Sequence, residues 1–190
     1  DLYAYQKNEW ALRLAAGERV EIFNGSGFAW SGPIRFSADA AWVEIDAVTE
    51  KANESPVFMT LVQSLVAPEK MEWIVEKAVE TGISAILLVP AERSVTKLAG
   101  ERLAKRLSRL TDIARSAAEQ CGRNVVPTIS AAPTLKAGLA EAEAEVRLML
   151  APGAEAGIPA AIRPGLHSAA FAVGPEGGFT DAEIELAKAS

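Results

Sequence analysis

The hydrophobic pattern from residue 57 onward alternates between two kinds of segment. Short apolar runs, typical of strands buried on both faces, occur at VFMTLVQSLV, ISAILLVP, VVPTIS, VRLMLAP and SAAFAV. Between them, PEKMEWIVEKAVETG, residues 101–121 and TLKAGLAEAE carry apolar residues at helical spacing, and Gly82 is predicted to follow the end of the first helix. Strands that alternate with helices predict an α/β domain with a mostly parallel sheet covered on both faces.

Residues 1–52 have a different pattern, that of β-structure. In RVEIFNGSGFAWSG, two strand-like runs flank Asn24–Gly27, whose residue types tolerate the positive φ of a tight hairpin turn. AAWVEIDAV, residues 40–48, is predicted as a further strand. The polar stretch KANESP, residues 51–56, ends in proline and is predicted as a linker. We therefore predict a small β domain over residues 1–54 and an α/β domain over residues 55–190.

The stretch VGPEGGFTDAEI, residues 173–184, joins the last predicted strand to a helix. Thr180 is predicted as the N-cap of that helix, and Glu183, three residues later, would complete a capping box. Phe179 and Ile184 have the spacing of a hydrophobic staple. Because these residues specify the helix start on their own, the preceding loop, GPEGG, is free for another task.

GPEGG, residues 174–178, is one of three loops expected at the carboxyl edge of the sheet, where ligands of open α/β sheets bind. The others are PAERS, residues 90–94, and LAPG, residues 150–153. A phosphate cradle fits GPEGG poorly, because a following GK[ST] is missing, Pro175 lacks an N–H and Glu176 would repel phosphate. A neutral or cationic ligand, such as an adenosyl group with a sulfonium, fits better; a plain Gly/Pro turn is the alternative.

The charge of the chain is unevenly distributed. The net charge of −6 argues against a general polyanion binder, but residues 93–123 hold eight basic and three acidic side chains. On the predicted helix 101–121 the basic residues fall opposite the apolar ones and form a stripe. This stripe is a candidate contact for a nucleic-acid backbone, and a solvated helix face is the alternative.

Cysteine and histidine each occur once, as Cys121 and His167. An intramolecular disulfide and a Cys-rich zinc site are therefore excluded, and a metal site built on histidine is not expected. No apolar run approaches the roughly 18 residues of a membrane span, and the first residues, DLYAYQKNEW, lack the pattern of a signal peptide. These features predict a cytoplasmic protein with no metal and no membrane segment.

Three segments, in order and with similar spacing, resemble the signature blocks of the RsmE family: EKMEWIVEKAVETGISAILLVPAERS, AAEQCGRNVVPTI and VGPEGGFTDAEI. Members of that family are 16S ribosomal RNA methyltransferases of the SPOUT superfamily, which use S-adenosylmethionine to form N3-methyluridine in the 30S subunit. The resemblance covers residues 57–190, and ALRLAAGERVEIFNGSG resembles the family's N-terminal domain. It implies a PUA-like β-barrel that holds RNA over residues 1–54, a Rossmann-like SPOUT domain with a trefoil knot over residues 55–190, and a homodimer.

The resemblance also implies roles for individual residues. The cofactor is expected to lie against Leu150, Ala151, Gly174, Pro175, Glu176, Gly177 and Gly178. The catalytic candidates are Arg123, which would stabilise the anion that forms on uracil, and the carboxylates Glu119 and Glu176, which could remove its proton. Helix capping or salt bridging is the alternative for Glu119. RNA contacts are expected from Arg93, Lys97, Arg102, Arg106, Arg109 and Arg123.

The chain departs from the family pattern at two places. It has NEWALRL where the family shows a His-containing stretch, so we expect the N-terminal domain to be divergent or incomplete. It also ends at Ser190, ahead of the LG-x-x-ILR-x-ETA segment that in the family completes the knot and closes the cofactor pocket. We therefore expect weak or no cofactor binding by this chain alone.

Two other functions remain open at this point. A non-catalytic RNA-binding module would explain the predicted β domain and the basic stripe without any cofactor. A small-molecule enzyme on an ordinary doubly wound sheet would use another nucleotide cofactor and would not need the first 50 residues. Binding of S-adenosylmethionine separates the first alternative from a methyltransferase.

Overall fold

The computed structural model of the chain describes residues 14–50, 53–97, 99–154, 157–158 and 163–190. Most of NEWALRL and the first residues of the predicted linker lie outside the described residues. The chain divides into two compact units. Unit 1 comprises Asp1–Glu54 and Ala118–Val126, and unit 2 comprises Ser55–Ala117 and Pro127–Ser190.

Unit 1 contains an antiparallel sheet built on a hairpin. Strands β1 (Arg19–Phe23) and β2 (Phe28–Phe36) pair antiparallel, from Arg19 opposite Pro33 to Phe23 opposite Ala29. The turn between them has Gly25 and Gly27 at φ of 84° and 92°, and Asn24 Oδ1 accepts a hydrogen bond from Ser26 N at 3.0 Å. The predicted hairpin is therefore confirmed, and its glycines are needed because other residues rarely adopt positive φ.

The prediction of one strand over residues 40–48 is wrong. The segment forms two short strands, β3 (Ala41–Val43) and β4 (Ala47–Glu50), which pair with opposite ends of β2. The chain between them crosses β2 at Gly32, where an added Cβ would lie 1.9 Å from the carbonyl oxygen of Glu44. The strand is divided because the glycine lets another backbone pass directly over β2, which an alternation pattern cannot indicate.

A distant segment of the chain, Ala118–Val126, belongs to unit 1, although the sequence placed it in the second domain. Ser26 and Val125 form a β-bridge, and Gly27 N donates to the Asn124 carbonyl at 3.2 Å. The Asn124 side-chain amide donates in return to the Gly27 carbonyl at 2.7 Å. These bonds join residues about a hundred positions apart, so they leave no local sign in the sequence. Closure of unit 1 into a barrel stays a prediction.

Unit 2 is built on a five-stranded parallel sheet. Its strands are β5 (Phe58–Ser64), β6 (Ala85–Val89), β7 (Thr128–Ala131), β8 (Val146–Leu150) and β9 (Ser168–Val173). They lie in the order β7-β6-β5-β9-β8, and every neighbouring pair is parallel. The predicted parallel sheet is therefore confirmed, and the five predicted strands match the five observed ones within a few residues.

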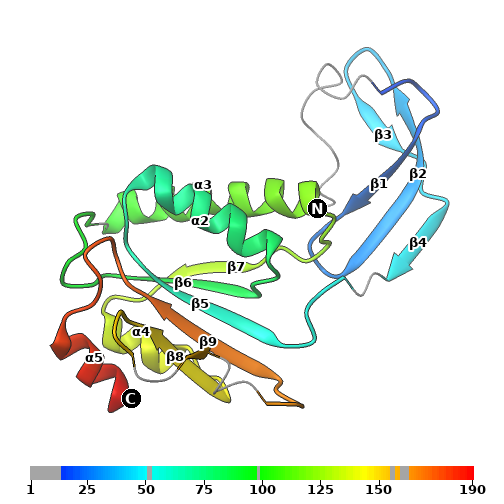
Figure 1. The fold of residues 1–190 in the computed structure, drawn as a ribbon. Helices are drawn as coiled ribbons and strands as arrows, with labels where there is room; N and C mark the ends of the chain where they lie inside the picture. Colours follow the sequence, from blue (N-terminus) through cyan, green and yellow to red (C-terminus); the bar gives the residue numbers. More distant parts are fainter. Residues whose placement is uncertain (1–13, 51–52, 98, 155–156, 159–162) are drawn as a thin grey trace. The chain divides into compact units, whose positions relative to one another are not determined.

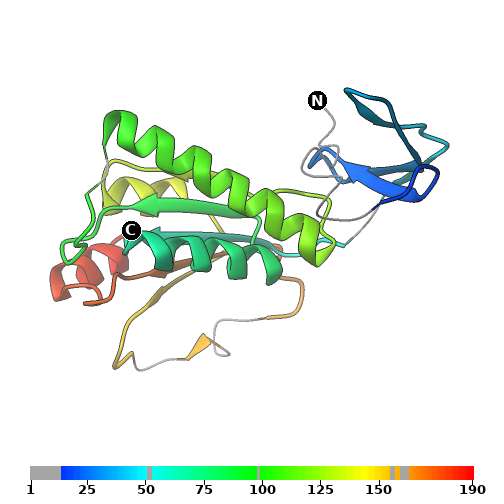
Figure 2. The ribbon, with the colours of Figure 1, turned by 90° about the horizontal axis from the view of Figure 1, so that it is seen from above.

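Helices cover both faces of this sheet, as predicted (Figures 1 and 2). On one face lie α2 (Pro68–Glu80) and α3 (Gly100–Cys121), the end of which extends into the unit 1 segment. On the other lie α4 (Leu135–Glu141) and α5 (Asp181–Lys188). The chain thus proceeds outward from β5 through β6 to β7, then crosses to the opposite edge at β8 and returns inward to β9 beside β5.

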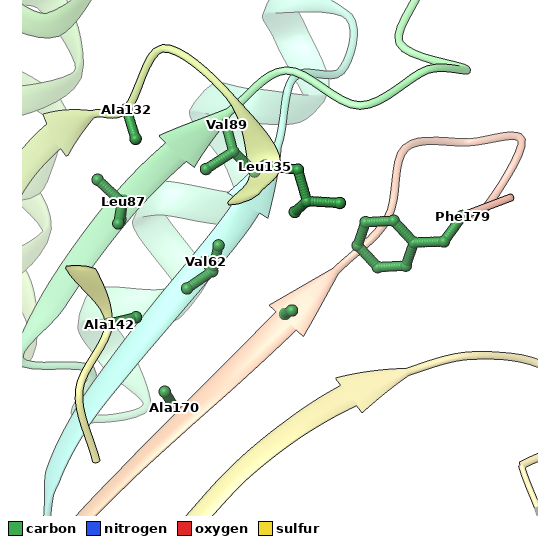
Figure 3. Packing of buried hydrophobic residues seen from close by; sticks show 9 residues of the cluster. Val62, Leu87, Val89, Ala132, Leu135, Ala142, Ala170 and Phe179 are labelled. Carbon is green, nitrogen blue, oxygen red and sulfur yellow. The ribbon is translucent and has the colours of Figure 1, made fainter. Parts of the chain in front are cut away.

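The core of unit 2 follows the alternation of the strands. Val62, Leu87 and Val89 pack with Leu135 of α4 and with Phe179, the residue before the α5 cap (Figure 3). The alternate strand residues, such as the buried Leu61, Ile86 and Leu88, face the opposite side and the buried residues of α2 and α3. Both faces of these strands are therefore buried, which is why their sequences are unbroken hydrophobic runs.

The predicted helix signals are confirmed in the structure. Thr180 caps α5 and forms a complete capping box with Glu183, and Ile184 packs against the cluster that contains the buried Phe179. At the end of α2, Gly82 has a φ of 90° after the C-cap residue Thr81. These features depend only on residues a few positions apart, which is why the sequence predicts them well.

Candidate functional site at the carboxyl edge of the sheet

The carboxyl edge of the unit 2 sheet has its switch point between β5 and β9. From β5 the chain proceeds through β6 to β7 on one side, whereas β9 and β8 lie on the other side. Open α/β sheets bind ligands in the crevice outside the strand ends at such a point. The loop that follows β9 there is Gly174–Gly178, the GPEGG stretch.

The GPEGG loop is a tight turn that depends on its glycines. Gly178 N donates to the Pro175 carbonyl at 2.8 Å, and Gly178 has a φ of 69°. A Cβ on Gly174 would lie 3.2 Å from backbone atoms of Gly178 and Phe179. The start and end of the loop are thus in close contact, which requires glycine at position 174, whereas a Cβ added to Gly178 would meet nothing within 4 Å.

The PAERS loop, which follows β6, is bonded directly to the GPEGG loop. Arg93 Nη1 donates to the Gly177 carbonyl at 2.7 Å and to the Phe179 carbonyl at 3.3 Å. Glu183 Oε1 accepts a hydrogen bond from Glu92 N at 2.8 Å, so the capping box of α5 also joins the two loops. The sequence placed both loops at the same edge, and the structure brings them together as one bonded assembly.

Glu176 extends from the loop to the first turn of α2. Its Oε1 accepts from Ala67 N at 3.4 Å and lies 3.4 Å from Lys70 Nζ, at a helix start that has no side-chain cap of its own. Its own backbone N–H, then the N–H of Ala67 and the ammonium of Lys70, lower the pKa of the Glu176 carboxyl against the opposing effect of desolvation. This carboxylate is therefore ionised near neutral pH and is a weaker base than an ordinary glutamate.

The LAPG loop, which follows β8, lies beside a cavity of about 550 Å³. Ala151 lines this cavity together with residues of β8, β9, α4 and α5, among them Leu148, Ala172 and Ile184. Leu150 is 40 % exposed and is not among the lining residues. None of the GPEGG residues lines it either, so the structure places the residues expected to bind cofactor in two neighbouring places at the same edge.

Ser64, at the carboxyl end of β5, was not singled out from the sequence. It is fully buried, and its hydroxyl has no hydrogen-bond partner among the described residues. Gln63 pairs in register with Val173, so continuing the register places Ser64 beside Gly174 at the start of the GPEGG loop. A buried hydroxyl without a partner is costly. The signal in the sequence was the polar pair QS inside the apolar run VFMTLVQSLV.

Arg123 and Glu119, two of the catalytic candidates, lie in the segment that belongs to unit 1. Arg123 is only 6 % exposed, and its Nε donates to both carboxylate oxygens of Glu54 at 3.1 Å; its Nη2 also bonds Glu54. Glu119 is exposed on the last turn of α3. The guanidinium of Arg123 is thus bound by a carboxylate from KANESP, a stretch that the sequence indicated only as a polar linker.

The basic stripe of α3 divides into two parts. Arg106 Nη1 bonds Glu72 of α2 at 2.8 Å, and Arg109 bonds both oxygens of the same carboxylate at 3.2 Å. Hydrogen bonds from Arg109 and then Arg106 lower the pKa of the Glu72 carboxyl. Arg102 in the first turn of α3 and Lys97, which precedes the helix, are exposed and form no ion pair with another described residue. The stripe therefore both joins α3 to α2 and offers free cations near its start.

The sequence model of the family described as RNA methyltransferase domain matches residues 53–190. The chain belongs to this RNA methyltransferase family. The match spans all of the described strands and helices of unit 2, together with the GPEGG and PAERS loops.

Relatives within the RNA methyltransferase family confirm the resemblance to RsmE. The chain is 28% identical over 183 residues to the ribosomal RNA small subunit methyltransferase E of Bacillus subtilis, covering 92% of this chain and 72% of the relative. It is 28% identical over 188 residues to the Synechocystis enzyme of the same name, covering 93% of this chain and 58% of that relative.

Two solved structures of the same kind superpose closely. A Legionella pneumophila protein in complex with the bound cofactor SAM has a TM-score of 0.87 at 31% identity, covering 95% of this chain and 75% of that one. The ribosomal RNA small subunit methyltransferase E of Neisseria gonorrhoeae, bound to S-adenosyl methionine, has a TM-score of 0.85 at 33% identity, with the same coverage. The α/β fold of this family is therefore shared over nearly the whole chain.

Two further observations concern the described part of the chain. None of its helices is long and apolar enough to cross a membrane. Within the same residues, no cluster of three or more His, Cys, Asp or Glu side chains has the arrangement of a metal site.

Replacing Glu176 with glutamine is expected to lower the thermal unfolding temperature at pH 7. A pKa below the ordinary value means that the folded state favours the ionised carboxyl, so this stabilisation is present above about pH 4.3. This stabilisation is lost as the pH falls through the folded-state pKa, so the difference in unfolding temperature between Glu176→Gln and wild type should shrink toward pH 3. Thermal unfolding of both proteins between pH 7 and pH 3 measures that difference.

Glu143→Gln is the matched control for Glu176→Gln, because Glu143 is exposed on the same unit and no described residue bonds its carboxylate. Its substitution should leave the unfolding temperature nearly unchanged across the whole pH range. An equal loss in both variants, or a Glu176→Gln difference that grows at low pH, would show that the contacts to Ala67 and Lys70 do not stabilise the ionised form.

Proposed function

We propose that this chain carries the catalytic domain of an S-adenosylmethionine-dependent methyltransferase that acts on small-subunit ribosomal RNA. The observation that carries the proposal is the bonded GPEGG assembly at the switch point, in a chain that shares its fold with two SAM-bound relatives at TM-scores of 0.85 and 0.87. The resemblance to RsmE supports a finer proposal, namely methylation of uracil N3 at one uridine of 16S RNA in the 30S subunit.

The residues of the edge fit such a cofactor. Glu176 is ionised and would face a cation favourably, and a Cβ added to Gly178 would meet nothing within 4 Å, so the loop backbone is open to close approach at that residue. The buried Ser64 hydroxyl supplies a polar atom that lacks a partner among the described residues. When bound, S-adenosylmethionine supplies an electrophilic methyl group on a positively charged sulfur. We propose that the GPEGG loop holds it, together with Leu150 and Ala151 at the neighbouring strand end.

The proton on uracil N3 requires a base, because N3 must lose it before or during attack. We propose an electrostatic role for Glu176, since its lowered pKa makes that carboxylate a weaker base than an ordinary glutamate. Arg123 is bound by Glu54, so we propose that it acts mainly by holding the segment on which Glu119 lies.

Contacts with RNA are proposed for the free cations of the basic stripe. Lys97 and Arg102 are exposed and would reach phosphate oxygens, whereas Arg106 and Arg109 are bonded to Glu72 and would contribute only the field of their charge. Unit 1 is proposed to hold the RNA as a PUA-like domain, and the enzyme to act as a homodimer.

The proposal predicts that the intact protein binds S-adenosylmethionine and transfers its methyl group to small-subunit rRNA. Calorimetric titration measures the first step, and radiolabelled methyl transfer to 30S subunits measures the second. Mass spectrometry of 16S rRNA from a strain that lacks the protein should show one N3-methyluridine missing. Tight RNA binding with no heat on addition of S-adenosylmethionine would instead favour a non-catalytic RNA-binding module, for which the basic stripe is the supporting observation.

A further inference from the structure

We infer that Arg93 is a positioning residue for the GPEGG loop, and that its guanidinium does not serve as an RNA phosphate contact. The inference rests on the proposed function, because it assigns Arg93 to the cofactor loop of that site. It replaces the role expected from the sequence, in which Arg93 was one of the predicted RNA contacts.

The hydrogen bonds of Arg93 span Gly178, the glycine of the loop that has a positive φ. One guanidinium nitrogen, Nη1, reaches the carbonyls of Gly177 and Phe179, at 2.7 and 3.3 Å. These carbonyls lie on either side of Gly178, whose φ of 69° turns the chain toward α5. A cation that bonds both carbonyls therefore holds this turn in one shape, and hydrogen bonds from a charged donor are stronger than neutral ones.

The stem of Arg93 also packs against the loop. Gly177 has no side chain, and a Cβ added there would lie 3.3 Å from both Cβ and Cδ of Arg93. Contact at this distance is tighter than an ordinary carbon–carbon contact of about 3.5–4.0 Å. Arg93 and Gly177 are thus matched in shape as well as in hydrogen bonding, which a residue that reaches outward to a phosphate would not need.

The backbone around Arg93 is itself held in place. Ser94 N donates to the Ala91 carbonyl at 3.0 Å, and Ala91 N donates to the Ser94 hydroxyl at 3.2 Å, so residues 91–94 form a closed turn. Glu183 bonds Glu92 N at 2.8 Å and Thr180 N at 2.9 Å. The arginine therefore projects from a fixed turn, and its position is coupled to the start of α5.

If Arg93 supports the cofactor loop and Arg102 contacts RNA, replacing each of them should give opposite results. Arg93→Met should weaken S-adenosylmethionine binding about tenfold or more, because two charge-assisted bonds to the loop are lost, and should change RNA affinity less than about twofold. Arg102→Met should do the reverse, since Arg102 is exposed and forms no ion pair with another described residue. Calorimetry with S-adenosylmethionine and filter binding of 16S rRNA measure the two affinities on the intact protein.

The separate effects on KM and kcat, together with the conservative variant Arg93→Lys, distinguish a positioning role of Arg93 from a general loss of structure. Arg93→Met should raise KM for S-adenosylmethionine more than it lowers kcat, whereas misfolding would lower the active fraction and leave KM unchanged. Arg93→Lys keeps the positive charge, which would be enough for a contact with an RNA phosphate. The lysine side chain is shorter and cannot bond both carbonyls in the same way, so cofactor binding should be restored only in part. Wild-type cofactor affinity in Arg93→Lys, or a loss of RNA affinity alone in Arg93→Met, would overturn the inference.

A double-mutant cycle with Gly177 tests the match directly. Gly177→Ala should weaken cofactor binding in the wild-type background, where the new Cβ meets the Arg93 stem. In an Arg93→Ala background that stem is gone, so Gly177→Ala should have little further effect. Independent, multiplying effects would contradict the inference and leave the proposed function intact, whereas a wild-type protein that binds no S-adenosylmethionine would overturn both.

Discussion

Replacing Gly32 with alanine is expected to lower the free energy of unfolding of unit 1 by about 3 kcal/mol or more. The added methyl carbon would lie 1.9 Å from the Glu44 carbonyl oxygen and 2.7 Å from its carbon. These atoms are backbone, held on either side by hydrogen bonds from Glu44 N to the Pro33 carbonyl and from Asp46 N to the Ser31 carbonyl, each 3.1 Å. Neither strand can move away without breaking its pairing, so relaxation cannot relieve the clash.

Hydrogen–deuterium exchange, followed in separate peptide fragments, measures the stability of unit 1 and of unit 2 separately. Amides of β2, β3 and β4 should exchange faster in Gly32→Ala, while those of the parallel sheet in unit 2 should keep wild-type rates. Ser31→Ala, the neighbouring substitution that adds no atom to the crossing, is the control and should change stability by no more than about 0.5 kcal/mol. Equal protection in Gly32→Ala and wild type would mean that the chain does not cross β2 at this residue.

The second large effect is expected at Arg123, where alanine should lower the free energy of unfolding of unit 1 by about 3 kcal/mol. The guanidinium is 6 % exposed and bonds the Glu54 carboxylate through Nε and Nη2. Its removal leaves the partly buried Glu54 carboxylate without its cation, and breaking such a pair from one side costs more than the pair itself is worth. A purely catalytic arginine would predict unchanged stability and lost turnover.

Two variants make the Arg123 experiment specific. Arg35→Ala removes an exposed ion pair of the same unit, with Glu44, and should cost less than about 1 kcal/mol. In the double variant Arg123→Ala with Glu54→Ala, no carboxylate is left buried, so its loss should be smaller than the sum of the two single losses. Chemical denaturation followed by fragment-resolved exchange gives the energies. Additive losses would contradict a direct Glu54–Arg123 interaction.

If Arg123 is structural, its effect on methyl transfer should follow the folded fraction of unit 1. Methyl transfer by Arg123→Ala, measured well below its unfolding temperature, should then recover toward wild type. A loss of turnover of a hundredfold or more in a fully folded variant would instead support the catalytic role that the RsmE resemblance implied.

Local chemistry was predictable from the sequence. The five strands of unit 2, the end of α2 at Gly82 and the capping box of Thr180 and Glu183 all depend on residues within one element or one turn. Burial on both faces makes each parallel strand a continuous apolar run, and a helix start is specified by its own cap, so neither requires knowledge of the partner. Two of the three RsmE blocks lie in these same segments, which is why the family could be inferred early.

Only the tertiary structure decided which side chains act on one another. Arg93 and Gly177 are 84 residues apart and Glu54 and Arg123 are 69 apart, so no periodicity or spacing connects them. In the sequence alone, Arg93, Arg106, Arg109 and Arg123 are equivalent cations; the fold gives the first to loop carbonyls, the next two to Glu72 and the last to Glu54. Charge is a local property of the chain, but the partner of a charge is set by where distant backbone segments are packed, and burial then fixes how much the pairing is worth.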